Sequence, residues 1–162
     1  MLKHLLLVAL VAVTILCVTH EEVKPREVSR IEISSIEVMN AINKYSLIYE
    51  VPRDYVLKCA HQETSYSGVV NFDYNHKRVS SYGALGPFQV IYSTAKSMMK
   101  DSNFTKEDLK NNVDLNVHCG IKYMRYLYNI YHDWTIVYSY YNQGYVGVNN
   151  INSYARKITK GG

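Results

Sequence analysis

The residue best placed to do chemistry is Glu63, which stands on the apolar face of a short helix expected over residues 52–63. Val56, Ala60 and Glu63 follow one another at helical spacing, and Pro52 suits the first turn of such a helix. A carboxylate on a core-facing stripe is unfavourable unless the acid is paired or protonated. Glu63 is therefore a candidate for a carboxylic acid that stays protonated near neutral pH and acts as a general acid.

Two further segments carry residues of interest. The segment 80–89 reads SSYGALGPFQ, and its glycines indicate a tight turn that can lie beside the acid. The segment 141–144 reads YNQG and ends a helix expected from Trp134 to Tyr141, for which Asp133 is a suitable N-cap. The glutamate, the glycine turn and this helix end thus form three separate candidate parts of one site.

The elements that must position these parts are mostly helical. Ser34 to Glu37 resemble a capping box, and they predict a helix whose inward face carries Ile36, Met39, Ile42 and Tyr45. Residues 64–88 are expected to form a long loop, with a short strand over 69–72. Three more helices are expected: one capped by Ser93 or Thr94 and running to Lys100, one capped by Thr105, and a long one with Val117, Ile121, Met124, Tyr128 and Tyr131 on one face.

The amino-acid composition limits the classes of protein to which the chain can belong. The 162 residues are 48% hydrophobic, which favours one folded domain with a proper core. The chain has sixteen tyrosines and three phenylalanines, which suits a hydrated groove lined by aromatic side chains. A general bias in the amino-acid usage of the genome explains this ratio equally well. The net charge of +4 suits an anionic polymer such as a cell wall. Because the basic residues are dispersed, nucleic acid is not an expected partner.

The N-terminus resembles a targeting segment. Residues 5–18 are almost unbroken apolar residues after a short basic start, which fits either a signal peptide or an N-terminal membrane anchor over 1–20. Residues 21–33 are expected to be a linker and 34–158 the folded domain, working outside the cytoplasm. Contact with the membrane is expected only through the N-terminal segment.

The cysteines and histidines suggest no metal or cofactor. Cys59 and Cys119 lie on two expected helices, and they fit either a disulfide or two buried free thiols. The histidines considered as ligands form no His-Glu-x-x-His pattern, so no metal site is expected; they are His61, His76, His118 and His132. Cys59 lies mid-helix on the apolar face, where a thiol is usually inert.

Three motifs in order carry a resemblance to a known family. They are His-Gln-Glu63-Thr-Ser, then Ser80-x-x-Gly83-Ala84-x-Gly86-x-x-Gln89 with Thr94-Ala95, then Tyr141-Asn142-Gln143-Gly144 after a helix that carries Asn116, Gly120 and Tyr123. Over roughly residues 40–150 the chain resembles the catalytic domain of the soluble lytic transglycosylases. The resemblance implies a mainly α fold of the lysozyme-like α+β superfamily. Its bundle-like helical lobes surround a glycan cleft, with one long loop or small β element near 66–80.

The resemblance also implies roles. Glu63 would be the single acid and base, and it would cleave the bond between N-acetylmuramic acid and N-acetylglucosamine of peptidoglycan with formation of a 1,6-anhydro ring. Ser80 would hydrogen-bond near the acid, and Tyr141 would lie beside it. The remaining members of the implied substrate-binding set are Gln89 and Phe88 in the groove and Asn142 at the local turn.

The chain departs from the family pattern in four places. Thr64 replaces a serine, Pro87-Phe88 replaces Leu-Met, Tyr92 replaces a proline, and residues 69–78 resemble an insertion. Two alternatives stay open: a lysozyme-type hydrolase of peptidoglycan or chitin, and a non-catalytic glycan-binding or assembly protein. The implied setting is periplasmic, cell-envelope or virion-associated, with envelope-spanning machinery or virion proteins as candidate partners.

Overall fold

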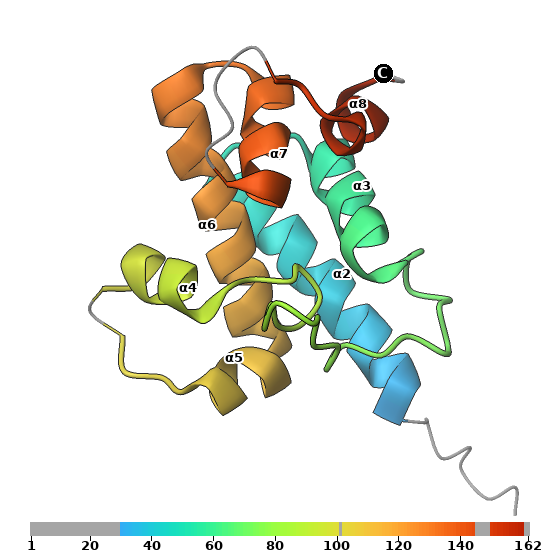
Figure 1. Cartoon of the computed structure of the whole chain (residues 1–162). Coiled ribbons are helices and arrows are strands. Elements are labelled where there is room, and N and C mark those ends of the chain that lie inside the picture. Colours follow the sequence, from blue (N-terminus) through green and yellow to red (C-terminus); the bar gives the residue numbers. More distant parts are fainter. Residues whose placement is uncertain (1–29, 101, 145–149, 161–162) are drawn as a thin grey trace, which may run out of the picture.

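The computed structural model describes residues 30–100, 102–144 and 150–160, and within these residues the fold is mainly helical. The two longest helices, α2 (Arg30–Ile48) and α6 (Val113–Tyr131), pack against each other through the centre of the molecule (Figure 1). The hairpin partner of α6 is α7 (Trp134–Gln143), which packs against α8 (Ser153–Thr159). Helix α3 (Arg53–Thr64) contacts both α2 and α8.

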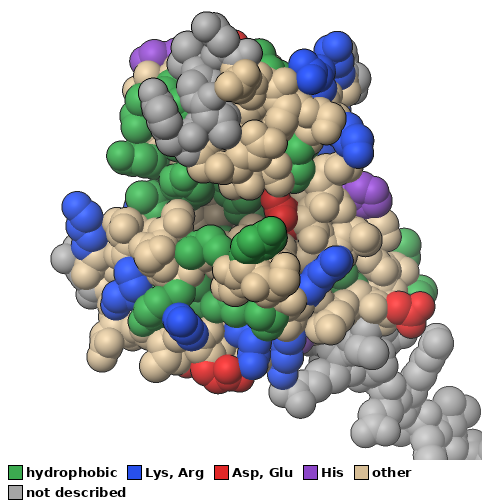
Figure 2. Space-filling view, viewed as in Figure 1, with side chains coloured by type: hydrophobic (Ala, Val, Ile, Leu, Met, Phe, Trp, Pro, Cys, Tyr) green, Lys and Arg blue, Asp and Glu red, His purple; other side chains and the backbone are tan. Residues whose placement is uncertain are grey.

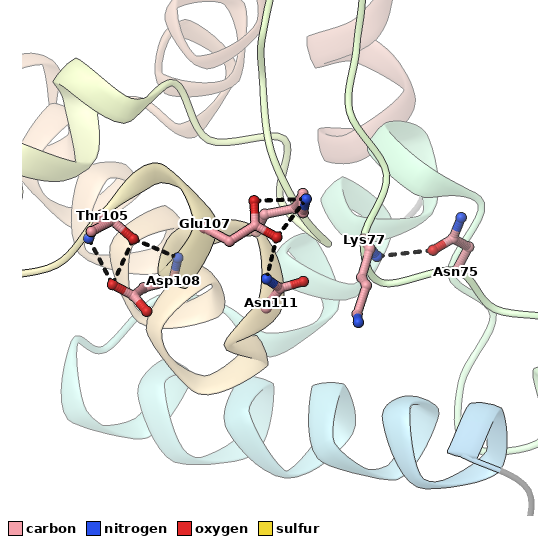
Figure 3. A network of polar contacts seen from close by, with 7 residues as sticks. Asn75, Lys77, Thr105, Glu107, Asp108 and Asn111 are labelled. Atoms are coloured by element: carbon pink, nitrogen blue, oxygen red, sulfur yellow. Dashed lines mark hydrogen bonds and ion pairs between the residues drawn. The ribbon is translucent and has the colours of Figure 1, made fainter.

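Two short helices complete the other side of the molecule. Helices α4 (Tyr92–Met98) and α5 (Lys106–Asn111) both pack against α6, and in Figure 1 they lie away from α3 and α8. Helix α5 begins with a capping box, because the Thr105 hydroxyl accepts from the Asp108 N–H while the Asp108 carboxylate accepts from the Thr105 N–H (Figure 3). The cap expected at Thr105 is thus confirmed.

Side-chain caps also set where the last helices begin. The Asn112 side chain accepts from the Leu115 N–H, which starts α6 as a helix separate from α5. The Asp133 carboxylate accepts from the Thr135 and Ile136 N–H groups, which confirms the predicted start of α7. Gly144 follows the end of α7 with a φ of 70°, a conformation that glycine adopts without strain.

The start of the first described helix differs from the prediction. Helix α2 begins by Arg30, so Ser34 and Ser35 lie inside it and are buried rather than capping its first turn. The Ser35 hydroxyl donates to the Asn71 carbonyl, 2.8 Å away, and this long-range bond explains why a serine is accommodated there. Ile36 is 44% exposed instead of facing inward, because the buried face of α2 runs through Val38, Ala41, Ile42 and Tyr45.

The long loop between α3 and α4 carries little regular structure. The strand expected over 69–72 is wrong, since turns occupy this segment, and the described β-structure is limited to bridges pairing Leu85 with Val79 and Val90. Tyr74, from the segment that resembles an insertion, is buried edge-on against Tyr66 with ring centroids 5.0 Å apart. The insertion is therefore anchored in the core by aromatic packing.

The expected leader 1–20 and residues 21–29 of the expected linker lie outside the described residues. None of the helices described is long and apolar enough to cross a membrane.

Candidate active site

Glu63 lies on the last turn of α3, where its side chain is partly buried. Burial raises the pKa of this carboxyl above its usual range, while a hydrogen bond from Tyr154 and the positive charge of Arg78 act in the opposite direction. The raised pKa favours the protonated acid that was predicted from the position of Glu63 on the helix. In the described part of the chain, the charged group that influences this pKa is a cation rather than a second carboxylate.

Tyr154 of α8 is the partner of Glu63, and sequence reasoning missed it. Its hydroxyl donates to the Glu63 Oε1, and it also lies 3.2 Å from the buried thiol of Cys59, one turn before Glu63 on α3. Helix α8 was not predicted, although Asn152 is a typical N-cap residue and Ala155 and Ile158 share helical spacing. These signals could have found the helix, but nothing local links Tyr154 to Glu63.

Tyr141 of α7 connects the acid to the glycine turn. Its hydroxyl donates to the Phe88 carbonyl over 2.8 Å, and burial, Cys59 and Glu63 together raise its pKa well above the usual value. Since Glu63 acts on this pKa, the tyrosine lies within electrostatic range of the acid. The hydrogen bond to Phe88 fixes Tyr141 at the glycine turn, and the place beside Glu63 that the resemblance implies for it stays a prediction.

Phe88 requires a correction, because its side chain does not line a groove. The ring is fully buried against α6, where a Cβ built on Gly120 would lie only 2.8 Å from the Cβ of Phe88. Its backbone serves the site instead, since the Phe88 carbonyl accepts from Tyr141 and its N–H donates to Asn116. Phe88 stands where the family pattern has a methionine, and its ring thus fills the core rather than the groove wall.

A buried asparagine shapes the glycine turn. The Asn116 side chain is fully buried, donates to the carbonyls of Leu85 (2.8 Å) and Leu109 (3.1 Å), and accepts from the Phe88 N–H (3.0 Å). Gly86 has a φ of 70°, and a Cβ there would lie 2.4 Å from the Asn116 amide nitrogen. Only glycine allows the turn to approach Asn116 this closely.

Ser80 and Gln89 lie at the two sides of this turn. The Ser80 hydroxyl accepts from the Ala84 N–H over 3.0 Å, so the described contacts place it as a brace of the turn. The Gln89 amide donates to the carbonyls of Gly86 (2.9 Å) and Arg78 (3.2 Å), and its backbone has a φ of 45°. A non-glycine residue in this region is strained, and such strain is common near functional sites.

Thr64, which follows the acid, ties α3 to the same turn. Its buried hydroxyl lies 3.1 Å from the Pro87 carbonyl and 2.9 Å from the Tyr74 hydroxyl. Threonine keeps the hydroxyl of the serine that the family pattern has at this position. The substitution therefore preserves a polar link between the end of α3 and the loop.

Asn142 helps to position α8, the helix that was not predicted from the sequence. Its side-chain oxygen accepts from the Asn152 amide over 3.2 Å, and Asn152 in turn caps α8 by accepting from the Ala155 N–H over 2.8 Å. Asn142 is exposed and acts on the site through α8, which carries Tyr154 to Glu63. The local turn expected at Asn142 is thus connected to the acid through Asn152 and Tyr154.

The face shown in Figure 2 is hollowed between the upper helices and the loop, and hydrophobic side chains line part of the hollow. Three pockets of about 980, 570 and 400 Å³ are formed elsewhere, and Glu63 lines none of them. In the described chain, no three His, Cys, Asp or Glu side chains group as metal ligands.

The fold is shared with two solved enzymes. One is the 70 kDa soluble lytic transglycosylase of Escherichia coli, with 24% sequence identity and a TM-score of 0.56; the match covers 65% of this chain and 16% of that one. The other is lytic transglycosylase Slt of Pseudomonas aeruginosa, solved as an inactive mutant with glutamate replaced by glutamine, with 15% identity, a TM-score of 0.56 and the same coverage. The chain thus spans about a sixth of the length of either enzyme.

The family is shown by sequence. No significant match was found among curated proteins. The model of the transglycosylase SLT domain matches residues 40–160, which include Glu63, the glycine turn, Tyr141 and Tyr154. The chain therefore belongs to the transglycosylase SLT domain family.

Proposed function

We propose that the protein is a peptidoglycan lytic transglycosylase that cleaves the β-1,4 bond between N-acetylmuramic acid and N-acetylglucosamine. The observation that carries the proposal is Glu63, a partly buried acid with a raised pKa, held by Tyr154 within a transglycosylase SLT domain. A carboxyl group in this state can donate a proton near neutral pH, as cleavage of a glycosidic bond requires.

The proposed reaction needs one acid. Glu63 protonates the glycosidic oxygen, and the bond from this oxygen to the anomeric carbon breaks. The C6 hydroxyl of the same muramic acid residue then attacks the anomeric carbon and gives its proton to the Glu63 carboxylate. The products are a free hydroxyl on one sugar and a 1,6-anhydro ring on the other, and no water is consumed.

The surroundings of Glu63 favour this reaction over hydrolysis. Hydrolysis usually uses two carboxyl groups about 5–9.5 Å apart, the second of which activates water or attacks the sugar. Arg78, rather than a second acid, is the charged side chain that acts on Glu63. An internal hydroxyl needs no such activation, and its favourable orientation can lower the barrier by about 7–11 kcal/mol at best.

Product analysis tests the reaction type. The purified protein is incubated with peptidoglycan, and the soluble fragments are analysed by mass spectrometry with and without borohydride reduction. We expect fragments that are lighter by one water and resist reduction, because their anhydro ends carry no free aldehyde. Fragments with reducing ends alone would show a hydrolase instead.

Substitution of the acid tests the role of Glu63. Glu63→Gln keeps the shape of the side chain but has no proton to donate, so we expect the rate of wall lysis to fall by at least about 100-fold. Glu37→Gln, an exposed glutamate of α2, is the matched control and should leave the rate unchanged. Retained lysis by a folded Glu63→Gln variant would instead favour a non-catalytic or differently catalysed activity.

We further propose that the protein works outside the cytoplasm, in the periplasm, in the cell envelope or on a virion. The apolar segment 5–18 and the location of peptidoglycan support export. Local opening or remodelling of the wall, alongside an envelope-spanning machine or virion proteins, is the role that fits a small exported enzyme. Fractionation of cells that produce the full chain, followed by N-terminal sequencing, tests export and cleavage of the leader.

A further inference from the structure

A second concave site lies between α4 and the C-terminal half of α6. Its volume is about 980 Å³, within the range of ligand-binding pockets in proteins. The loop between α4 and α5 contributes Lys100, and α6 contributes Lys122, Tyr123, Arg125 and Tyr126. None of these side chains belongs to the site around Glu63.

The lining of this pocket is positively charged. Three cations and no Asp or Glu occur among its lining residues. Arg125 is already engaged, since its guanidinium donates to the carbonyls of Tyr49 and Glu50 and lies 3.5 Å from the Glu50 carboxylate. Lys122 contacts only the Met99 sulfur, at 4.0 Å, and no carboxylate of the described residues pairs with Lys122 or Lys100. Within the described residues, these two ammonium groups therefore have no carboxylate partner and can meet an anionic ligand.

The pocket adjoins the acid through two aromatic rings. Tyr123 lines the pocket, and its ring centroid lies 5.7 Å from that of Tyr141. Tyr141 in turn bonds to the Phe88 carbonyl, and Thr64, the residue after the acid, bonds to the neighbouring Pro87 carbonyl. Figure 2 shows Lys and Arg side chains gathered on the α4 and α5 side of the hollowed face. A polymer that places one bond at Glu63 can therefore extend toward the two lysines.

We propose that Lys100 and Lys122 bind the carboxylates of the peptide stems that branch from the glycan strand. This inference rests on the proposed function, because it takes peptidoglycan as the ligand. In an intact strand the lactyl carboxyl of each muramic acid is bound in an amide to its stem, so the negative charge lies on the stem carboxylates, and a cationic pocket matches the stems better than the glycan. Lysines suit this task since their ammonium groups are point charges on flexible stems, while Tyr123 and Tyr126 offer aromatic surface to sugars and aliphatic groups.

Binding measurements test the proposal without requiring cleavage. Soluble glycan strands are prepared in two forms: with their peptide stems, and after removal of the stems by an amidase followed by chemical amidation of the lactyl carboxylates that this cut exposes, so that the stripped strand stays uncharged. The affinity of the full chain carrying Glu63→Gln for each form is measured by isothermal titration calorimetry. Lys100→Gln and Lys122→Gln are then added singly and together, with Lys160→Gln as the control that removes an exposed lysine lining none of the three pockets.

We expect each lysine substitution to weaken binding of stem-bearing strands about two- to fivefold, the range for partly exposed ion pairs. The double variant should lose about tenfold, the loss should shrink at high salt, and binding of stripped strands should not change. Equal losses on both forms would mean that the lysines contact the glycan itself, and unchanged affinity on both would leave them without a role; either result overturns the proposal. Failure of the proposed function is distinct, since the protein with Glu63 intact would then cleave neither form.

Discussion

Glu63 is subject to opposing influences, and its chemistry depends on their balance. Burial raises its pKa, whereas the hydroxyl of Tyr154 and the charge of Arg78 favour the ionised form. A group that must first donate and then accept a proton benefits from such a balance, because neither form is strongly disfavoured. The tyrosine therefore tunes the acid as well as positioning it.

Removing the Tyr154 hydroxyl should shift the pH profile of the enzyme. Tyr154→Phe deletes the hydrogen bond that lowers the Glu63 pKa, so this pKa should rise further. The alkaline fall in kcat/KM, which reports loss of the acid's proton, should move to higher pH, with a loss of about tenfold or more in the maximum. The check is kcat/KM on soluble glycan strands, measured over a range of pH. Tyr82→Phe is the control, because the Tyr82 side chain is 91% exposed. If the alkaline fall in kcat/KM stayed at the same pH in Tyr154→Phe, Tyr154 would not be the group that lowers the Glu63 pKa.

The raised pKa of Glu63 also makes a prediction about stability. Because folding raises this pKa, the folded protein holds the proton more tightly than the unfolded chain does. The stability that Glu63 contributes is therefore present at low pH, and it is lost as the pH rises from the ordinary glutamate pKa through the raised one. Glu63→Gln stays neutral and should gain stability relative to the native chain over this rise. Urea unfolding of both proteins at about pH 4 and about pH 8 measures the two free energies of unfolding. The shift would be refuted if Glu63→Gln gained no stability relative to the native chain between these pH values.

The turn over residues 80–89 depends on how closely its backbone approaches α6. Both glycines have a positive φ, 76° at Gly83 and 70° at Gly86. A Cβ at Gly86 would collide with Asn116, whereas nothing lies within 4 Å of a Cβ at Gly83. Gly86→Ala should therefore lower the free energy of unfolding by about 2–4 kcal/mol, through backbone strain and collision together. Gly83→Ala, which has the strain alone, should lose about 1–2 kcal/mol. Urea unfolding compares the two, and equal losses would show that the Asn116 contact is unimportant.

The helices with strong end signals were predictable from the sequence. Thr105 and Asp133 cap α5 and α7 through their own side chains, and such local bonds leave a recognisable pattern. Ser34 to Glu37 showed the same pattern inside α2, where Ser35 bonds to Asn71, thirty-six residues away. A capping pattern therefore locates a helix more reliably than it locates the start of that helix.

The candidate site was predictable only in part. Glu63, Ser80, Gln89 and Tyr141 were singled out through motif order, and their roles stay predictions. In the structure Ser80 and Gln89 bond within the glycine turn, and Tyr141 bonds to it. The partner of Glu63 was missed because its contact joins residues 91 positions apart, which helical spacing cannot indicate. Phe88 was assigned to the groove by its place in the motif, yet Gly120 leaves room for its ring in the core. Local patterns thus found the parts, while their pairing depended on tertiary packing.

The core of the whole domain is closed without covalent cross-links among the described residues. Cys59 and Cys119 are free thiols. Of the two possibilities that the sequence left open, a disulfide or two buried thiols, the structure has the second. Burial raises the pKa of Cys119 to about 11 and that of Cys59 well above its usual value. Neither thiol should therefore ionise at neutral pH or react readily.

Thiol titration checks this arrangement in the intact protein. We expect Cys59 and Cys119 to stay unreactive toward Ellman's reagent in native protein and to react fully in denaturant. A reducing agent should leave the melting temperature unchanged, since no cross-link between them exists to be broken. A fall in melting temperature on reduction would instead indicate a disulfide.

The bond between Tyr154 and Glu63 has a consequence for the order in which the molecule becomes functional. A ribosome completes α3, the glycine turn and α7 before it reaches residue 154, and the 91 residues that separate the two partners take roughly 5–20 seconds to make. Until α8 docks, the acid lacks the hydroxyl that tunes it. A nascent chain therefore carries an incomplete candidate site, and the proposed capacity to cut a cell wall would arrive with the last helix to be synthesised among those described.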